Sequence, residues 1–388
     1  MTPASSATGS LVIHSARLVD DGAIVDDAWV RIEHGRVVSR GVGASWVPAD
    51  QVVDAKAVAG TDAVLAPGFI DIHGHGGAGA SFDDGVGAIR TARALHREHG
   101  TTRAVVSLVT APLDDLALRV GEIADLMETD ADILGSHLEG PFLDPAHHGA
   151  HEPTLLRNPI GADVSRLLAA GRGTIRQVTI APELPGGLDA IRLIVDSGAA
   201  AAVGHTSADD AIAVAAFEAG ASVLTHAFNA MPGIHHRAPG PVLAAAADHR
   251  VVLEAIADGV HLDPHVIKLV FDSAPGRVAL ITDAMAAAGS DDGHYDLGAV
   301  SVTVKDGIAR ADDTGSIAGS TLTQDAALRG AIAAGVALPE AIRALTATPA
   351  RAIGYGDRLG RLVDGFVGDA VLLDAQLRVV RVWVGDRP

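Results

Sequence analysis

The chain has 388 residues, a formal charge of −19, and a composition that is 48% hydrophobic but only 3% aromatic. This length suits one large α/β barrel with a small companion domain. Because there is no cysteine, disulfides, thiolate metal ligands and a cysteine nucleophile are excluded. Lys and Arg gather in no stripe, so we expect neither a nucleic-acid partner nor an anionic membrane partner.

The N-terminal ten residues are small and polar, and we interpret them as a disordered leader. They have neither the basic start nor the apolar stretch of a signal peptide. No apolar run in the chain reaches the roughly 18 residues that a membrane span requires. We therefore expect a cytoplasmic protein.

Both ends of the chain carry short segments in which apolar and polar residues partly alternate, at residues 11–13, 29–32 and 36–38 and again at 369–373 and 379–384. Glycine-containing turn signals separate the N-terminal segments, which is typical of antiparallel strands. We predict that residues 1–62 and 356–388 together form one small β-sandwich domain.

Between these ends, residues 63–355 alternate apolar strand-like runs with Ala- and Leu-rich segments of helical period. Eight such alternations predict a closed (β/α)8 TIM-type barrel rather than an open sheet. Residues 291–318 interrupt the pattern and predict a β-hairpin inserted after the last strand. The eight strands are expected at residues 64–72, 102–109, 132–138, 175–180, 200–204, 222–225, 251–256 and 278–281.

The first barrel strand ends in His73-Gly74-His75, followed by more glycine. Side chains two residues apart on a strand point to the same side, so the two imidazoles are expected to project together. Two adjacent imidazoles with little bulk around them make half of a metal site.

Other metal-binding side chains stand where later strands end: Glu139, His205, His226 and Asp283. The carboxyl ends of barrel strands converge on one face, where catalytic groups lie. Four imidazoles and two carboxylates suit one or two divalent ions of the zinc type, with iron, manganese and cobalt as alternatives. His137 lies two residues before Glu139, and we expect it behind the ligands.

Five motifs stand at the ends of later strands: HLEGPFL at 137–143, VGHTS at 203–207, THAFNAM at 225–231, DGVH at 258–261 and ITDA at 281–284. With these motifs the chain resembles the N-acetylglucosamine-6-phosphate deacetylases of the amidohydrolase superfamily, nearly throughout from residue 11. The most specific part of the resemblance is HLEGPF together with THAFNAMPG at 225–233 and ADGVH at 257–261. The resemblance implies removal of the acetyl group from N-acetylglucosamine 6-phosphate, giving glucosamine 6-phosphate and acetate.

The resemblance also implies roles for the strand-end residues. Glu139, His205 and His226 match the metal ligands used throughout the family, and His73 with His75 matches members that bind a second ion. Asp283 would accept a proton from water and deliver it to the leaving amine. A metal ion or His151 would face the acetyl oxygen as it becomes negative.

The same resemblance assigns the substrate side. Arg237 is the expected phosphate partner, although an exposed loop with solvated charges is an alternative interpretation of its surroundings. Family members are typically dimers in which one subunit completes the other's phosphate pocket, so we expect a homodimer. The remaining positions matched to substrate contacts are Ala150, Asn229, Ala230, His261, Ile317, Ala318 and Gly319.

Two other functions remain open from the sequence. One is a cyclic-amide hydrolase or deaminase of the same superfamily, although these commonly use a bridging lysine where this chain has Glu139. The other is a barrel without catalysis that acts as a binding scaffold, against which the complete ligand set argues.

Overall fold

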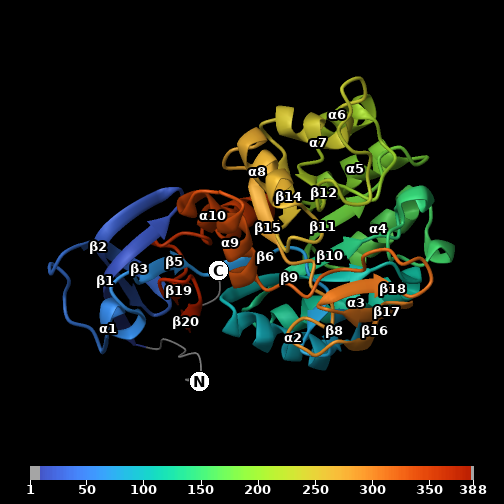
Figure 1. Cartoon of the computed structure of the whole chain (residues 1–388). Helices are drawn as coiled ribbons and strands as arrows, with labels where there is room; N and C mark the ends of the chain where they lie inside the picture. The colour runs from blue at the N-terminus through green and yellow to red at the C-terminus, as the bar shows by residue number, and fades with distance from the viewer. Residues whose placement is uncertain (1–8, 386–388) are drawn as a thin grey trace.

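The computed structural model describes residues 9–385. The leader predicted for residues 1–10 lies outside the described residues except at its end, where Ser10 already begins the first strand. Figure 1 shows the blue N-terminal and red C-terminal strands together at one side, with the barrel at the other.

The larger part is a (β/α)8 barrel, which confirms the predicted fold. Its eight strands form one sheet in which every pairing is parallel, in the order β15-β14-β13-β12-β11-β10-β9-β6. The strands are β6 (Phe69–Asp71), β9 (Thr101–Val109), β10 (Ile133–Glu139), β11 (Ile175–Ile180), β12 (Ala200–Val203), β13 (Val223–Leu224), β14 (Val252–Ile256) and β15 (Val278–Ile281).

Helices cover the outside of this sheet and bury a continuous core of Ala, Val, Leu and Ile against it. The helices are α2 (Val86–Glu98), α3 (Leu113–Met127), α4 (Gly161–Ala170), α5 (Gly187–Asp196), α6 (Asp210–Glu218), α7 (Gly240–Ala247), α8 (Pro264–Ser273), α9 (Gln324–Ala333), α10 (Leu338–Leu345) and α11 (Ala347–Ala352).

The barrel is closed between its first and last strands by a small set of hydrogen bonds. The Asp283 backbone amide donates to the His73 carbonyl at 2.9 Å. The buried Gln324 side chain, at the start of α9, donates to the carbonyls of Ile70 on β6 and Leu280 on β15. These contacts bring the ends of β6 and β15 together at the catalytic face.

The smaller part is one mixed sheet built from both ends of the chain and folded around a hydrophobic core of its own. The N-terminal part is not purely antiparallel, because β1 pairs in parallel with both β4 and β5. Its elements are β1 (Ser10–Asp20), β2 (Ala23–Glu33), β3 (Arg36–Val42), β4 (Gln51–Asp54), α1 (Ala55–Ala59), β5 (Val64–Pro67), β19 (Ala370–Leu373) and β20 (Val379–Trp383).

The strand predicted over residues 64–72 is in fact two strands. β5 pairs with β1 and β19 in the small sheet, and β6 begins the barrel after Gly68. A Cβ at Gly68 would lie 2.2 Å from the Thr102 hydroxyl, so only glycine fits at this crossing. Residues 64–67 therefore pair with the small sheet, whereas the division of the chain into domains at residues 62 and 355 stays a prediction.

The insertion after β15 has three antiparallel strands rather than the two of the predicted hairpin: β16 (Gly293–Leu297), β17 (Val300–Lys305) and β18 (Ile308–Ala311). The extra strand β16 precedes the hairpin. A small apolar cluster seats this sheet against Val109 and Met285 beside the barrel mouth. Within residues 9–385, no helix is both long and apolar enough to cross a membrane.

Candidate metal and active site

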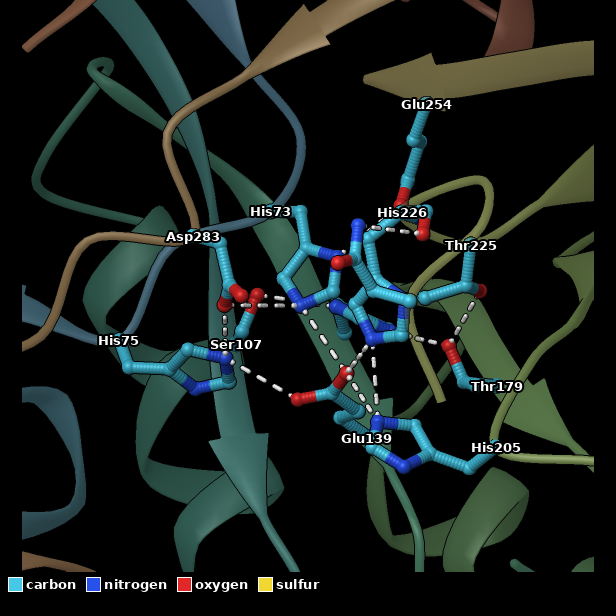
Figure 2. Close-up of polar contacts among 12 residues, drawn as sticks. His73, His75, Ser107, Glu139, Thr179, His205, Thr225, His226, Glu254 and Asp283 are labelled. Atoms are coloured by element: carbon cyan, nitrogen blue, oxygen red, sulfur yellow. Dashed lines mark hydrogen bonds and ion pairs between the residues drawn. The ribbon is translucent and has the colours of Figure 1, made fainter. Parts of the chain in front are cut away.

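The six strand-end residues converge on one point, as Figure 2 shows for His73, His75, Glu139, His205, His226 and Asp283. Glu139 is the last residue of β10, and the others lie just beyond β6, β12, β13 and β15. All six are buried. The folded chain thus gathers side chains that are up to 210 residues apart in sequence, from His73 to Asp283.

Three of these residues leave their strands through strained backbone. His205, His226 and Asp283 have φ values of +47°, +24° and +49°. Residues other than glycine rarely adopt this backbone conformation, because it costs about 1–3 kcal/mol per residue. Residues strained in this way are concentrated at functional sites. Here the turns redirect the side chains from the strand ends towards the centre.

One group of candidate ligands surrounds the Oε1 atom of Glu139. The Nε2 atoms of His205 and His226 lie 3.2 and 3.1 Å from this oxygen and 3.0 Å from each other. Zinc holds nitrogen and oxygen ligands at about 2.0–2.2 Å in a tetrahedron, which sets neighbouring ligands roughly 3.3 Å apart. The three atoms therefore fit one metal position, which we term position 1.

A second group lies on the other side of the same carboxylate. His75 Nε2 is 3.1 Å from Glu139 Oε2 and 3.2 Å from Asp283 Oδ1. His73 Nε2 is 3.3 Å from Glu139 Oε1 and 3.5 Å from Asp283 Oδ1. One ligand atom from each of these four residues lies within 4.8 Å of the others. We term this position 2, and Glu139 faces both positions.

An orphaned nitrogen supports a cation at this place. Within residues 9–385, the fully buried Nε2 of His73 has no hydrogen-bond partner. Leaving a buried polar atom unsatisfied costs about 1–3 kcal/mol, which a bound cation would offset. The residues present therefore fit a divalent metal, in agreement with the metal site predicted from the sequence.

Negative charge dominates the electrostatics of the site. Burial opposes protonation of His73, yet the carboxylates of Glu139, Glu254 and Asp283 hold its pKa well above the usual range. Burial likewise opposes ionisation of Asp283, but His73 and His75 lower its pKa to about 2. Excess carboxylate charge around imidazoles is the field that a divalent cation requires.

His151 is a neutral hydrogen-bond donor beside these ligands. Burial lowers its pKa to about 4. Its Nδ1 accepts the Thr110 backbone N–H and lies 2.9 Å from the Thr110 hydroxyl. A neutral imidazole with an accepting Nδ1 carries its proton on Nε2, which lies 3.6 Å from Glu139 Oε2. Its N–H therefore faces the ligand centre.

A cavity of about 410 Å³ opens onto the ligands. Among the expected substrate residues, it is lined by Ala150, Asn229, Ala230, His261, Ile317 and Gly319 as well as by His151. Ala318 is fully buried in the core of the insertion and does not line it. The side of the cavity formed by Ile317 and Leu297 belongs to the insertion, so this sheet shapes the substrate space.

Arg237 is placed differently from the other expected substrate residues. It is exposed and is not among the residues that line the cavity. No Lys or Arg is found among the described residues that line it. The phosphate partner expected from the sequence is thus outside the cavity of a single chain.

A buried polar layer beneath the ligands was not anticipated from the sequence, except for His137. Both nitrogens of His137 meet hydroxyls, Nδ1 at Ser107 and Nε2 at Thr179. Glu254 belongs to the same buried layer and contacts His73 (Figure 2). The signal for Glu254 was present as the only charged residue in the apolar run of residues 251–257.

Comparisons with known proteins identify the family. The model of the amidohydrolase family matches residues 64–387. N-acetylgalactosamine-6-phosphate deacetylase of Escherichia coli O157:H7 is 36% identical over 96% of this chain and 97% of its own length. N-acetylglucosamine-6-phosphate deacetylase of Bacillus subtilis (strain 168) is 32% identical over 96% and 95%.

Solved structures show the same likeness in three dimensions. A mutant N-acetyl-D-glucosamine-6-phosphate deacetylase of Mycobacterium smegmatis, in complex with N-acetyl-D-glucosamine-6-phosphate, matches with a TM-score of 0.91 and 40% identity over 98% of both chains. The resemblance inferred from the motifs is confirmed. The chain belongs to the amidohydrolase family, among the deacetylases of N-acetylated amino-sugar 6-phosphates.

Proposed function

We propose that this protein is a metal-dependent deacetylase that converts N-acetylglucosamine 6-phosphate and water to glucosamine 6-phosphate and acetate. The observation that carries the proposal is the ligand group around Glu139, with Asp283 beside it, at the floor of a cavity. The M. smegmatis relative bound to N-acetyl-D-glucosamine-6-phosphate supports the choice of substrate.

We propose zinc as the metal, with room for two ions. Glu139, His205 and His226 would hold one ion at position 1, and His73, His75, Glu139 and Asp283 would hold another at position 2. Iron, manganese and cobalt remain alternatives, because they also accept imidazole and carboxylate ligands. A bound divalent ion would lower the pKa of its water to near neutral pH, and it would also polarise the acetyl carbonyl.

Asp283 is the general base and then the general acid of the proposed reaction. It is ionised at neutral pH and sits on the cavity wall, so it can accept the proton of the attacking water. The amine leaves readily only when protonated, and Asp283 is placed to return the proton to nitrogen. The same residue therefore serves both halves of the hydrolysis.

His151 donates from its Nε2–H to the acetyl oxygen as negative charge develops there. Thr110 fixes the tautomer, so the donor is in place before the reaction begins. The low pKa of His151 keeps it neutral, which means that it donates a hydrogen bond without transferring its proton.

Phosphate recognition is proposed to need a second subunit. The overall charge of −19 repels a phosphate ester, and the cavity of one chain has no Lys or Arg among its described lining residues. We propose a cytoplasmic homodimer in which Arg237 of one subunit approaches the cavity of the other, with His235 and His236 beside it.

The decisive experiment is acetate release from N-acetylglucosamine 6-phosphate on protein whose metal has been counted. Unphosphorylated N-acetylglucosamine serves as the matched control. Rapid release from the phosphate ester alone, lost on chelation, would support both the reaction and the phosphate requirement. No release of acetate from metal-loaded protein would contradict the proposal and favour a cyclic-amide hydrolase or a deaminase.

The 4-epimer is a second candidate substrate, because the E. coli relative is an N-acetylgalactosamine-6-phosphate deacetylase. The two sugars differ only in the orientation of one hydroxyl. The ratio of kcat/KM for the two phosphates, measured on the same preparation, assigns the preference. A tenfold ratio corresponds to about 1.4 kcal/mol of transition-state discrimination.

A further inference from the structure

Glu254 is a fully buried carboxylate in the middle of β14, on the opposite side of His73 from Glu139 (Figure 2). A buried carboxylate is costly unless it is paired. In the part of the chain that the structure describes, no Lys or Arg forms an ion pair with it. Its contacts are instead His73, the His226 backbone and Gln177.

Every one of these contacts can donate a hydrogen bond to Glu254. The His226 backbone N–H donates to Oε2 at 3.2 Å, and the Gln177 amide donates to Oε1 at 2.8 Å. His73 Nδ1 lies 3.0 Å from Oε2. Both oxygens of Glu254 thus accept a hydrogen bond, and His73 Nδ1 is placed to donate another to Oε2.

This contact determines what His73 offers to a metal. With a proton on Nδ1, a neutral imidazole presents the lone pair of Nε2. That Nε2 is the orphaned atom between Glu139 and Asp283 at position 2. The other imidazole of the pair differs, because His75 Nδ1 has no hydrogen-bond partner among the described residues.

The same oxygen also contacts the backbone of a residue at position 1. Oε2 of Glu254 accepts from the backbone of His226, whose imidazole is a ligand at position 1, and from the imidazole of His73 at position 2. Glu254 adds a third buried negative charge to those of Glu139 and Asp283. One divalent ion balances two such charges, and the third favours a further cation at position 2.

We propose that Glu254 is the positioning residue that makes position 2 a metal site, by orienting His73 and by adding the charge that a second divalent ion balances. The inference rests on the proposed metal-dependent function but concerns metal occupancy rather than turnover. Position 1 keeps its own three ligand atoms and does not use the Glu254 side chain as a ligand.

The test is the metal content of Glu254→Gln, which keeps the shape of the side chain and removes the charge. Wild-type and variant proteins are loaded with zinc, dialysed, and analysed for ions per subunit, with circular dichroism to check folding. We expect two ions in the wild type and one in the variant. Zinc titration should show the weaker site loosened by roughly 10- to 100-fold, as for other residues that orient a ligand.

Two further variants separate this role from general damage to the barrel. Glu254→Asp keeps the charge and should retain more of the second ion than Glu254→Gln. Gln177→Met removes a contact to Oε1 without touching His73, so it should keep two ions. Equal loss in Gln177→Met, or two tightly held ions in Glu254→Gln, would overturn the inference.

The wild-type protein distinguishes this inference from the proposed function. A wild type that holds one ion and still releases acetate overturns the inference and leaves the deacetylase proposal standing. A wild type that holds two ions, one of them lost in Glu254→Gln, supports the inference even if acetate is not released.

Discussion

Asp283 is the residue on which both proton transfers of the proposed reaction depend. Replacing it with Asn keeps the size of the side chain and removes the base. We expect kcat to fall by about 10²- to 10⁴-fold, the usual contribution of a positioned acid–base group. The exposed Asp313→Asn is the matched control and should leave kcat unchanged.

The measurement is steady-state acetate release at saturating substrate, with the metal content determined on the same samples. Asp283 is also a candidate ligand at position 2, so activity is compared between preparations of equal metal content. A kcat within threefold of the wild-type value at equal metal would remove Asp283 from the proton-transfer role.

His261 and Asp258 form a pH-dependent pair at the cavity wall, with Nδ1 and Oδ2 2.7 Å apart. Burial alone would lower the pKa of His261, but Asp258 raises it above 6.5; burial would raise the pKa of Asp258, but His261 lowers it below 3.8. The histidine's contribution is complete below pH 6.5 and is lost as pH rises through its raised pKa. The aspartate's contribution is complete above pH 3.8 and is lost as pH falls through its lowered pKa.

The pair should therefore stabilise the fold most between pH 3.8 and 6.5. A double-mutant cycle with Asp258→Asn and His261→Gln, measured by urea unfolding, should give a coupling energy of about 1.5–3 kcal/mol near pH 5.5. The coupling should shrink towards alkaline pH. A coupling that grows above pH 8 would contradict the protonated pair.

At the scale of single residues, the convergence of the six strand-end side chains was predictable because barrel topology places all strand ends on one face. No local pattern marks the layer beneath them. Glu254 and Gln177 are polar residues in buried strands, and only the folded barrel shows that they meet across it. The position of Arg237 outside the cavity was equally unpredictable, because the sequence of a loop does not show which surface its side chains face.

Arg103 links two elements that belong to different sheets. It lies on β9 in the barrel, is fully buried, and forms a bidentate pair with Asp369 at 2.6 and 2.9 Å, just before β19 of the small sheet. Asp369 also accepts the Gly385 backbone N–H. Arg103→Met leaves this carboxylate buried without its partner, which should cost about 3–5 kcal/mol of unfolding free energy.

Urea unfolding of three variants checks this expectation. Arg103→Met should be strongly destabilised, whereas Arg103→Met combined with Asp369→Leu should recover part of the loss, because no buried charge is left. Arg192→Met, which breaks an exposed pair with Asp189, should change the free energy by less than about 1 kcal/mol. Equal effects of the first and last variants would refute a buried link between the sheets.

At the scale of elements, the alternation of strands and helices was sufficient to predict the barrel. Two errors have different causes. The run of residues 64–72 looks like one strand, but Val64–Pro67 pairs with β1 and β19, whose positions along the chain are distant from it. The strand β16 pairs with the next strand, β17, but it carries His and Asp on its exposed side, so no apolar pattern marks it.

For the molecule as a whole, metal removal should lower stability, because the buried carboxylates at the catalytic face then lose the divalent charge that would face them. A ligand at 100 times its Kd stabilises the folded state by about 2.7 kcal/mol. We expect chelation to lower Tm by several degrees and zinc to restore it. A Tm that is the same with and without chelator, on protein shown to have lost its metal, would contradict this expectation.

The proposed dimer makes a prediction that only the assembled molecule can satisfy. If Arg237 completes the cavity of the other subunit, the Asp283→Asn and Arg237→Ala homodimers are both impaired, but mixed dimers of the two variants regain some activity. In a mixed dimer, one cavity carries both substitutions and the other carries neither. Refolding an equal mixture should make about half of the dimers mixed and about a quarter of all cavities intact. Activity should therefore rise to about a quarter of the wild-type value.

The control is the same pair of proteins mixed without unfolding, which should show only the sum of their separate activities. Gel filtration of each variant establishes whether the dimer itself survives. If Arg237 instead served the cavity of its own chain, every mixed dimer would contain one cavity without Asp283 and one without Arg237. Activity would then stay at the average of the two parents, so the mixing experiment distinguishes the two arrangements through activity alone.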